Sequence, residues 1–284
     1  MIRTVGIVGK PRPEEIFPVV PSLLEWLKQR GLEVLLDTET AGCCNAGPAL
    51  PREQLSSAVD LLVVLGGDGT ILATARALGD REVPILPVNL GGLGFLTSVT
   101  LDEMYPLLEE VLAGKHRMSA RIMAEAEVHR DGRIAQKQRA LNDAVVTQAA
   151  LARMMDFDLA VDGSHLSRYR ADGIIIATPT GSTAYSLAAG GPIILPDLDA
   201  FVITPICPHM LTNRPLVTAG DSLIEVQFPV EEALHLTLDG QVGFRLNAAD
   251  RVVVRKSRNR VLLVSPPKKT YFEVLHSKLR WGER

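Results

Sequence analysis

Hydrophobic residues in the first 115 positions follow two patterns that alternate along the chain. Short aliphatic runs, of which Leu61–Leu65 is the clearest, are typical of strands covered on both faces. Between these runs, apolar residues return every three or four positions, as in Ile16–Leu27, which is the spacing of one helix face. Repeated strand–helix units predict a parallel sheet with right-handed crossovers, so we expect a Rossmann-like α/β domain over residues 1–115.

Turn and cap residues bound the elements expected in this domain. The strands are expected at Val5–Val8, Leu32–Leu36, Leu61–Leu65 and Ile85–Val88. The first helix is expected to end at Gly31, a natural C-terminal cap, and Pro51 stands where another helix can start. We expect residues 37–50 to form a loop and residues 102–112 to form a helix that ends at Gly114.

After residue 116 the period of the hydrophobic residues changes to two. Apolar and polar residues alternate over 121–129, and Asp131-Gly132 supplies a hairpin turn. Further strand-like runs, separated by turn residues, predict an antiparallel β-sandwich domain over residues 116–266. These runs are Leu141–Thr147, Phe157–Val161, Ile174–Ala177, Phe201–Thr204, Leu223–Phe228, Leu234–Leu238, Arg251–Arg255 and Val261–Val264. We also expect one short helix within 183–189, and a C-terminal tail, residues 267–284, whose helix packs back on the first domain.

Composition narrows the class of protein without identifying it. The chain has 284 residues, of which 46% are hydrophobic and 22% charged, so it can bury a core. A net charge of −3 gives no basic field, which argues against a nucleic-acid partner. No apolar run reaches membrane-spanning length, and the N-terminal residues show no secretory pattern. Three sparse cysteines suit a reducing cytosol better than a disulfide framework, so we expect a cytoplasmic protein.

A glycine-rich loop follows the clearest aliphatic run. It reads Gly66-Gly67-Asp68-Gly69-Thr70, and its glycines can let backbone N–H groups approach phosphates at a helix N-terminus. The P-loop pattern occurs nowhere in the chain, and the dinucleotide fingerprint fails at Leu72, which is too large for close helix–strand contact. Asp68 would repel phosphate, but it suits a general base that receives a hydroxyl proton during phosphoryl transfer. The alternative is that Asp68 only caps the following helix.

A second polar loop follows the buried run Ile174–Ala177. Six of its nine residues from Thr178 to Ser186 carry hydroxyl groups, where a turn needs two or three. This density suits a ligand with many oxygen atoms, such as a dinucleotide, and Tyr185 can stack on a base. The alternative is a solvated Ser/Thr loop.

These segments together resemble the NAD kinases, the ATP-dependent enzymes that phosphorylate the 2′-hydroxyl of the adenosine ribose. The resemblance spans nearly the whole chain, and the segment 171–192 is its most specific marker. The other markers are Gly66–Thr70, Asn89–Phe95, Leu141–Asp143, Thr204–His209, Arg214–Leu216 and Asp239–Gln241. Members of the family have an α/β domain followed by a β-rich domain, in agreement with the division predicted above.

The resemblance implies roles for individual residues. Asp68 is the proposed catalytic base, and the phosphate loop of ATP comprises Gly66, Gly67, Gly69 and Thr70. Asp143 stands where many members have Glu. Its side chain is one methylene shorter, so a ribose hydroxyl that it binds must lie closer to the backbone of this residue. Asp172 is expected to bind the nicotinamide carboxamide, and Arg170 the pyrophosphate or the ligand of a neighbouring subunit. The residues expected at NAD are Asp68, Gly69, Asn142, Asp143, Arg153, Arg170, Asp172, Thr183, Ala184, Tyr185, Ser186, Leu187, Ala188 and Gln241.

The expected ligands are NAD and ATP, and the expected cofactor is a divalent cation, Mg²⁺ or Mn²⁺, that accompanies ATP. The sequence shows no cage of metal ligands, so the metal-binding residues stay unassigned. Relatives form homodimers and homotetramers, and we expect a homo-oligomer here. Two alternatives remain open at this point: a lipid or sugar kinase that shares the Gly-Gly-Asp-Gly motif, and a non-catalytic sensor that binds NAD or NADP.

Overall fold

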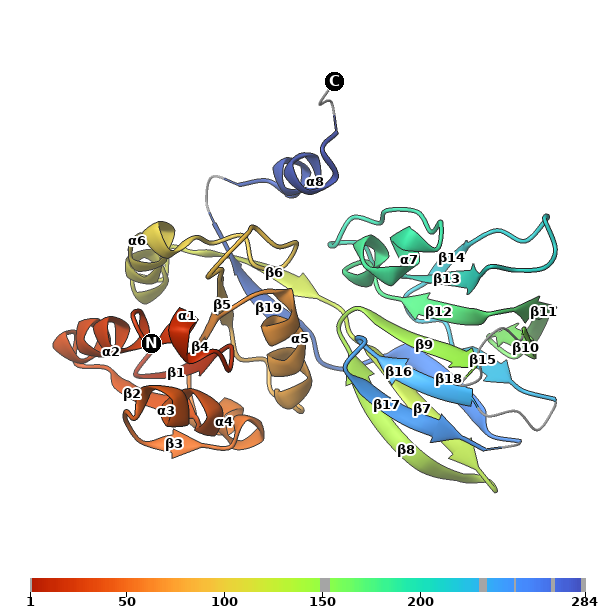
Figure 1. Cartoon of the computed structure of the whole chain (residues 1–284), viewed down its shortest axis with the longest axis horizontal. Coiled ribbons are helices and arrows are strands. Elements are labelled where there is room, and N and C mark those ends of the chain that lie inside the picture. The colour runs from red at the N-terminus through yellow and green to blue at the C-terminus, as the bar shows by residue number, and fades with distance from the viewer. Residues whose placement is uncertain (1, 149–153, 230–233, 248, 267–268, 282–284) are drawn as a thin grey trace. The chain divides into compact units, whose positions relative to one another are not determined.

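A computed structural model describes residues 2–148, 154–229, 234–247, 249–266 and 269–281. The chain forms two compact units (Figure 1). The first comprises Met1–Ala120 with Val261–Arg284, and the second comprises Arg121–Arg260. The structure therefore divides the chain at 120 and 260, where the sequence predicted division near 115 and 266. None of the helices in the described ranges is long and apolar enough to cross a membrane.

The first unit is built on one seven-stranded sheet with the strand order β3-β2-β1-β4-β5-β19-β6. The pairs from β3 to β19 that have a described register are parallel. Its strands are β1 (Thr4–Gly9), β2 (Glu33–Asp37), β3 (Ala49–Leu50), β4 (Leu61–Leu65), β5 (Ile85–Val88), β6 (Arg117–Arg121) and β19 (Val261–Ser265). Its helices are α1 (Pro13–Ile16), α2 (Val20–Gln29), α3 (Thr38–Cys44), α4 (Arg52–Ala58), α5 (Asp68–Ala77), α6 (Leu101–Leu112) and α8 (Tyr271–Leu279).

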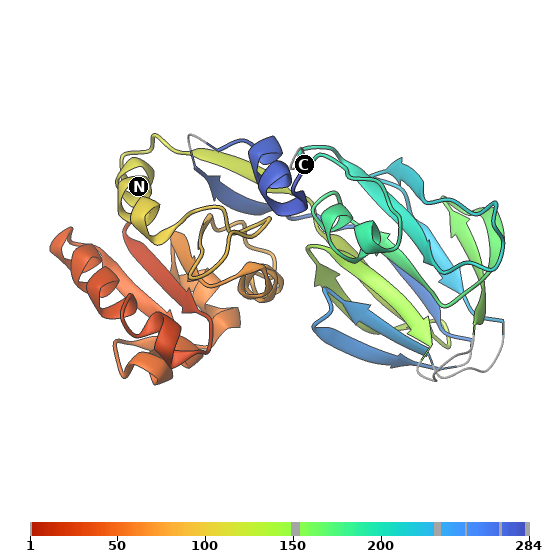
Figure 2. The same cartoon turned by 45° about the horizontal axis from the view of Figure 1, so that its top comes forward.

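Helices cover both faces of this sheet (Figure 1, Figure 2). One face packs with the buried sides of α2, α3 and α6, through strand residues such as Ile7 and Val63. On the opposite face, the space beside Gly6 is filled by Leu62 and by Leu55 of α4. All five residues of β4 are therefore buried, as its uninterrupted aliphatic sequence predicted.

Two expectations for this unit were wrong. Residues 37–50, expected as a loop, contain α3, whose first turn is capped by the Asp37 carboxylate accepting from the backbone N–H of Thr40 at 3.0 Å. A helix of seven residues shows too little apolar periodicity to be recognised. Val261–Val264, expected among the antiparallel strands, instead pairs in parallel with β5 through Leu263 and Ile85. A short buried run carries no signal for the sheet that it joins.

The second unit contains two six-stranded sheets. One has the order β11-β10-β15-β18-β7-β8 and the other β14-β13-β12-β9-β16-β17, and all their described pairs are antiparallel. The first sheet contains β7 (Ala124–Arg130), β8 (Arg133–Ala140), β10 (Met155–Val161), β11 (Ser164–Ala171), β15 (Ile224–Gln227) and β18 (Arg251–Lys256). The second sheet contains β9 (Asp143–Gln148), β12 (Gly173–Ala177), β13 (Ala200–Ile206), β14 (Leu216–Ala219), β16 (Leu234–Leu238) and β17 (Val242–Leu246). The helical elements η1 (Gly181–Thr183) and α7 (Tyr185–Ala188) follow β12.

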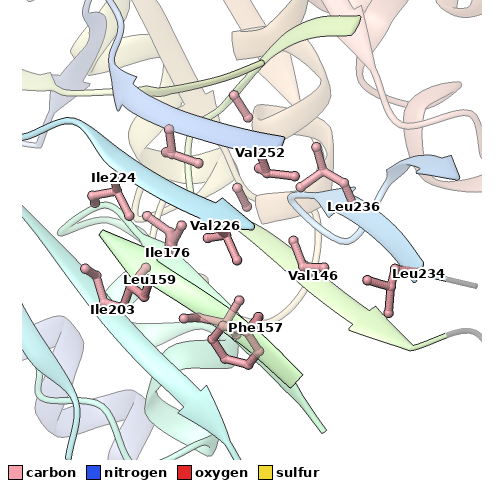
Figure 3. Close-up of a cluster of buried hydrophobic side chains, with 14 of the residues drawn as sticks. Val146, Phe157, Leu159, Ile176, Ile203, Ile224, Val226, Leu234, Leu236 and Val252 are labelled. Atoms are coloured by element: carbon pink, nitrogen blue, oxygen red, sulfur yellow. The ribbon is translucent and has the colours of Figure 1, made fainter. Parts of the chain in front are cut away.

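The two sheets bury a shared hydrophobic core, as the predicted sandwich requires (Figure 3). Phe157 and Val226 enter it from one sheet, and Ile176 and Val146 from the other. Strand β12 is buried along its whole length, because Ile175 on its other face packs in a second cluster with the segment that follows α7. The fold class predicted from the sequence, an α/β domain with an antiparallel β-sandwich domain and a C-terminal helix, is confirmed.

Candidate functional site

In the first unit, the glycine loop turns the chain from β4 into α5. Gly67 occupies the N-cap position, and Asp68 is the first helical residue. The Asp68 side chain does not cap its own helix. It points to the loop after β5, where Oδ2 accepts from the backbone N–H of Phe95 at 2.9 Å. Oδ1 accepts from the N–H of Leu96 at 3.0 Å and from the N–H and hydroxyl of Thr97, both at 3.1 Å.

This arrangement requires a very close approach between the two loops. A Cβ atom added at Gly94 would collide with the Asp68 carboxylate and the Thr97 hydroxyl, so only glycine fits there. The four donors are unevenly divided between the carboxylate oxygens, with three on Oδ1 and one on Oδ2. Each carboxylate oxygen offers about two acceptor directions. Oδ2 therefore keeps capacity for a further donor, such as a substrate hydroxyl.

In the second unit, the residues that precede and begin β9 are clamped from two sides. On one side, the Thr178 hydroxyl donates to the Leu141 carbonyl at 2.6 Å, and the turn at Gly181 is so close that a Cβ there would collide with the Asn142 backbone. On the other side, the Asp239 carboxylate accepts from the backbone N–H groups of Leu141, Asn142 and Asp143 at 3.2, 2.7 and 3.4 Å. Two segments that are far apart in the sequence thus hold the backbone of Leu141–Asp143 in place.

A pocket of about 400 Å³ lies beside this clamp. It runs from Asn142, which directly precedes β9, to Thr147 on that strand, and these five residue steps span about 17 Å, a length that suits an extended ligand. Thr147 pairs with Gly173, so the far end of the pocket lies one residue from Asp172. The pocket is lined by Asn142, Asp143, Val145, Thr147, Ala184, Tyr185, Thr237, Asp239 and Gly240.

Two carboxyl groups in this pocket differ in their surroundings. Asp239 accepts three backbone hydrogen bonds, from Leu141, Asn142 and Asp143. Asp143 is 3% exposed. Its burial, together with the nearby charge of Asp239, raises the pKa of the Asp143 carboxyl from 3.8 to about 7. At neutral pH the Asp143 carboxyl, with a pKa of about 7, can therefore either donate or accept a hydrogen bond in this pocket.

The hydroxyl-rich loop is organised differently from the sequence prediction. Most of its hydroxyl groups bond within the protein: Ser182 donates to the Pro179 carbonyl at 2.7 Å, and Ser186 bonds to the Thr204 hydroxyl at 2.9 Å. The high density of hydroxyl groups therefore indicates a tightly folded loop more than a surface for ligand oxygens. Tyr185, which is 45% exposed, is the hydroxyl-bearing residue of the loop that lines the pocket.

The predicted binding residues are distributed unevenly. Four of them line the pocket: Asn142, Asp143, Ala184 and Tyr185. Arg170, Asp172, Ala188 and Gln241 are exposed, Thr183 and Leu187 are half-buried, and Ser186 is fully buried. Arg153 lies outside the described residues. Asp68 and the residues of the phosphate loop, Gly66, Gly67, Gly69 and Thr70, belong to the first unit.

Sequence reasoning missed several lining residues. Thr147 and Thr237 lie on the outer face of β9 and β16, and their alternation with core residues was the available signal. Asp239 and Gly240 belong to the motif Asp239–Gln241, but only Gln241 was predicted from it as a binding residue.

Two family models match this chain. The ATP-NAD kinase N-terminal domain matches residues 48–116, and the ATP-NAD kinase C-terminal domain matches residues 141–265. Among curated proteins, the NAD kinase of Solibacter usitatus is 50% identical, covering 100% of this chain and 99% of its own length. The NAD kinase of Geotalea daltonii is 48% identical, and both chains are covered completely.

Solved structures agree with these matches. The yeast NADH kinase in complex with NADH is 28% identical with a TM-score of 0.93, covering 100% of this chain and 89% of that one. An NAD kinase from Archaeoglobus fulgidus in complex with ATP is also 28% identical, with a TM-score of 0.78 and 98% of each chain covered.

Proposed function

We propose how this chain, which belongs to the NAD kinase family and is an ATP-dependent NAD kinase, carries out its reaction. In this proposal the 2′-hydroxyl of the adenosine ribose of NAD attacks the γ-phosphorus of ATP. The O–P bond to ADP breaks, and the hydroxyl proton leaves as the new phosphate ester of NADP forms. Positioning and charge neutralisation supply most of the rate in such transfers.

The observation that carries the catalytic assignment is the Asp68 carboxylate. Its Oδ1 is saturated by three donors, whereas Oδ2 has one. We assign Oδ2 as the atom that accepts the hydrogen bond of the ribose hydroxyl and receives its proton. The backbone of Gly66–Thr70, at the start of α5, is assigned to the phosphate groups of ATP.

We assign the binding of NAD to the pocket of the second unit. The backbone of Asn142 and Asp143 is hydrogen-bonded to Asp239 at one end of the pocket, which Tyr185 also lines, and these groups suit an adenosine with its ribose hydroxyls. Asp172, near the other end, suits the nicotinamide carboxamide. The length of the pocket suits an extended dinucleotide, and the chemistry of the groups at its two ends is the basis for this order.

The experiment measures NADP formation from ATP, Mg²⁺ and NAD with an NADP-specific dehydrogenase. Asp68→Asn is expected to lower kcat by ~10²–10⁴-fold while NAD still binds, because removal of a general base typically costs that much. The matched control is Asp102→Asn, an exposed aspartate in the first turn of α6, which should keep normal turnover. Tight NAD binding by the wild type without NADP formation would contradict the activity, and near-normal turnover by Asp68→Asn would contradict the role of Asp68.

Three finer assignments belong to the same proposal. The divalent cation, Mg²⁺ or Mn²⁺, enters with ATP, whose phosphates it neutralises. The described residues contain no group of three or more His, Cys, Asp or Glu side chains placed to hold a metal, which suits a cation carried by its substrate. The three free cysteines suit a cytoplasmic location. We also propose a homo-oligomer, which analytical ultracentrifugation would test.

A further inference from the structure

The loop after β5 holds its shape through one side chain. Asn89, which is 6% exposed, accepts from the backbone N–H of Gly91 at 2.6 Å through Oδ1. Its Nδ2 donates to the Gly92 carbonyl at 2.8 Å and to the Thr97 hydroxyl oxygen at 2.7 Å. Exchanging the two amide atoms would place a donor against a donor at Gly91 and an acceptor against a carbonyl at Gly92, so these contacts fix the orientation of the amide.

This orientation determines the direction of the Thr97 hydroxyl. An amide NH₂ group can only donate, so the Thr97 oxygen accepts from Asn89 and must use its single proton elsewhere. The Asp68 Oδ1 lies 3.1 Å from that oxygen. Thr97 is completely buried, so water does not compete for the bond.

We propose that Asn89 and Thr97 are positioning residues of the phosphoryl transfer. The Asn89 amide directs the Thr97 hydroxyl proton to Oδ1 of Asp68. This contact and two backbone N–H groups anchor that oxygen, so the carboxylate cannot rotate and Oδ2 alone faces the acceptor hydroxyl. The inference rests on the proposed role of Asp68.

Thr97→Val tests the proposal, because valine keeps the branched shape and removes the donor. The variant is expected to lower kcat on the order of 10–100-fold, since a small misplacement of a reacting group has effects of that size. The KM for NAD should stay within about twofold, because the substrate loses no direct contact. Thr97→Ser keeps the hydroxyl and should restore most of the turnover.

The matched control is Thr74→Val on α5. Thr74 is 1% exposed, and its hydroxyl donates to the Thr70 carbonyl at 2.8 Å, so this change removes a buried hydroxyl that does not reach Asp68. Thr74→Val should keep the wild-type kcat. Equal losses in Thr97→Val and Thr74→Val, or equal losses in Thr97→Val and Thr97→Ser, would overturn the proposal.

A double-mutant cycle completes the test. Thr97→Val added to Asp68→Asn should not lower the residual rate further, because the hydroxyl acts through the carboxylate. Full additivity of the two losses would show that Thr97 acts elsewhere. NADP formation by the wild type in the same assay separates a failure of this inference from a failure of the proposed function.

Discussion

Replacing Asp143 by asparagine removes a titrating carboxyl group from the pocket with little change in shape. In the unfolded chain this carboxyl ionises near its ordinary pKa of 3.8, whereas burial raises the pKa in the folded protein to about 7. Between these two values the Asp143 carboxyl binds more protons in the folded state than in the unfolded state, so its contribution to the stability falls as pH rises. Above pH 7 the Asp143 carboxyl is ionised in both the folded and the unfolded state. The folded state then bears the full free-energy cost of a buried negative charge.

The magnitude follows from the difference between the two pKa values. A rise from 3.8 to about 7 corresponds to about 4 kcal/mol of unfolding free energy. Asp143→Asn does not incur this cost. The variant should therefore match the wild type below pH ~4 and exceed it by about 4 kcal/mol at pH 8.

Urea unfolding followed by circular dichroism, repeated between pH 4 and pH 8, measures this difference. Asp221→Asn is the control, because Asp221 is exposed in a turn of the same unit. The difference in stability between Asp221→Asn and the wild type, measured over the same pH range, provides the baseline for an exposed aspartate. A difference between Asp143→Asn and the wild type that stays constant over the same range would refute the assignment of a buried, protonated Asp143. The same variant should bind NAD more weakly, since it loses a carboxylate acceptor at the ribose.

Three further predictions concern other parts of the two units. Gly94→Ala should lower kcat by ~10²-fold, because the added Cβ displaces the Asp68 carboxylate; unchanged kinetics would show that the loop can relax. Tyr185→Ala should raise the Kd for NAD roughly threefold to tenfold through loss of stacking, and calorimetric titration would measure it; an unchanged Kd would place the base elsewhere. Lys269→Met should lower the unfolding free energy by up to about 1 kcal/mol, because Lys269 bonds to Ser98 and to Glu103 at 2.9 and 2.6 Å; 1 M salt should lessen this loss, and a salt-independent loss would argue against the ion pair.

The strands of the second unit that the sequence analysis did not identify share one position in the fold. They are β8, β11, β14 and β17, and each forms an edge of one of the two sheets in the second unit. Most residues of β8 and β11 are polar and exposed, with burial patterns that lack regular alternation. Edge strands are commonly protected by charged residues instead of being buried, so their sequences lack the hydrophobic signal on which recognition depends. The buried strands, such as β12, were predicted close to their observed bounds.

The candidate site was predictable to a similar extent. Asp68 follows the buried strand β4, Asn142 directly precedes β9 and Asp143 begins it, and their motifs indicate all three. The partners that determine their chemistry were not predictable. The Asp239 carboxylate bonds to backbone N–H groups almost a hundred positions away, and the Thr97 hydroxyl reaches Asp68 across 29 positions. Such contacts depend on tertiary geometry, to which residue spacing in a single sequence gives no access.

The division of the first unit into two stretches of chain affects how the protein folds during synthesis. Strand β19 lies between β5 and β6, but the whole second unit, residues 121–260, is translated before it. At roughly 5–20 residues per second, these 140 residues take about 7–28 seconds to synthesise. When that interval ends, the second unit has been synthesised as one contiguous stretch, while the parallel sheet still has an open position beside β5. Synthesis therefore completes the unit that holds the pocket beside Asn142 and Tyr185 before the sheet of the unit that contains Asp68.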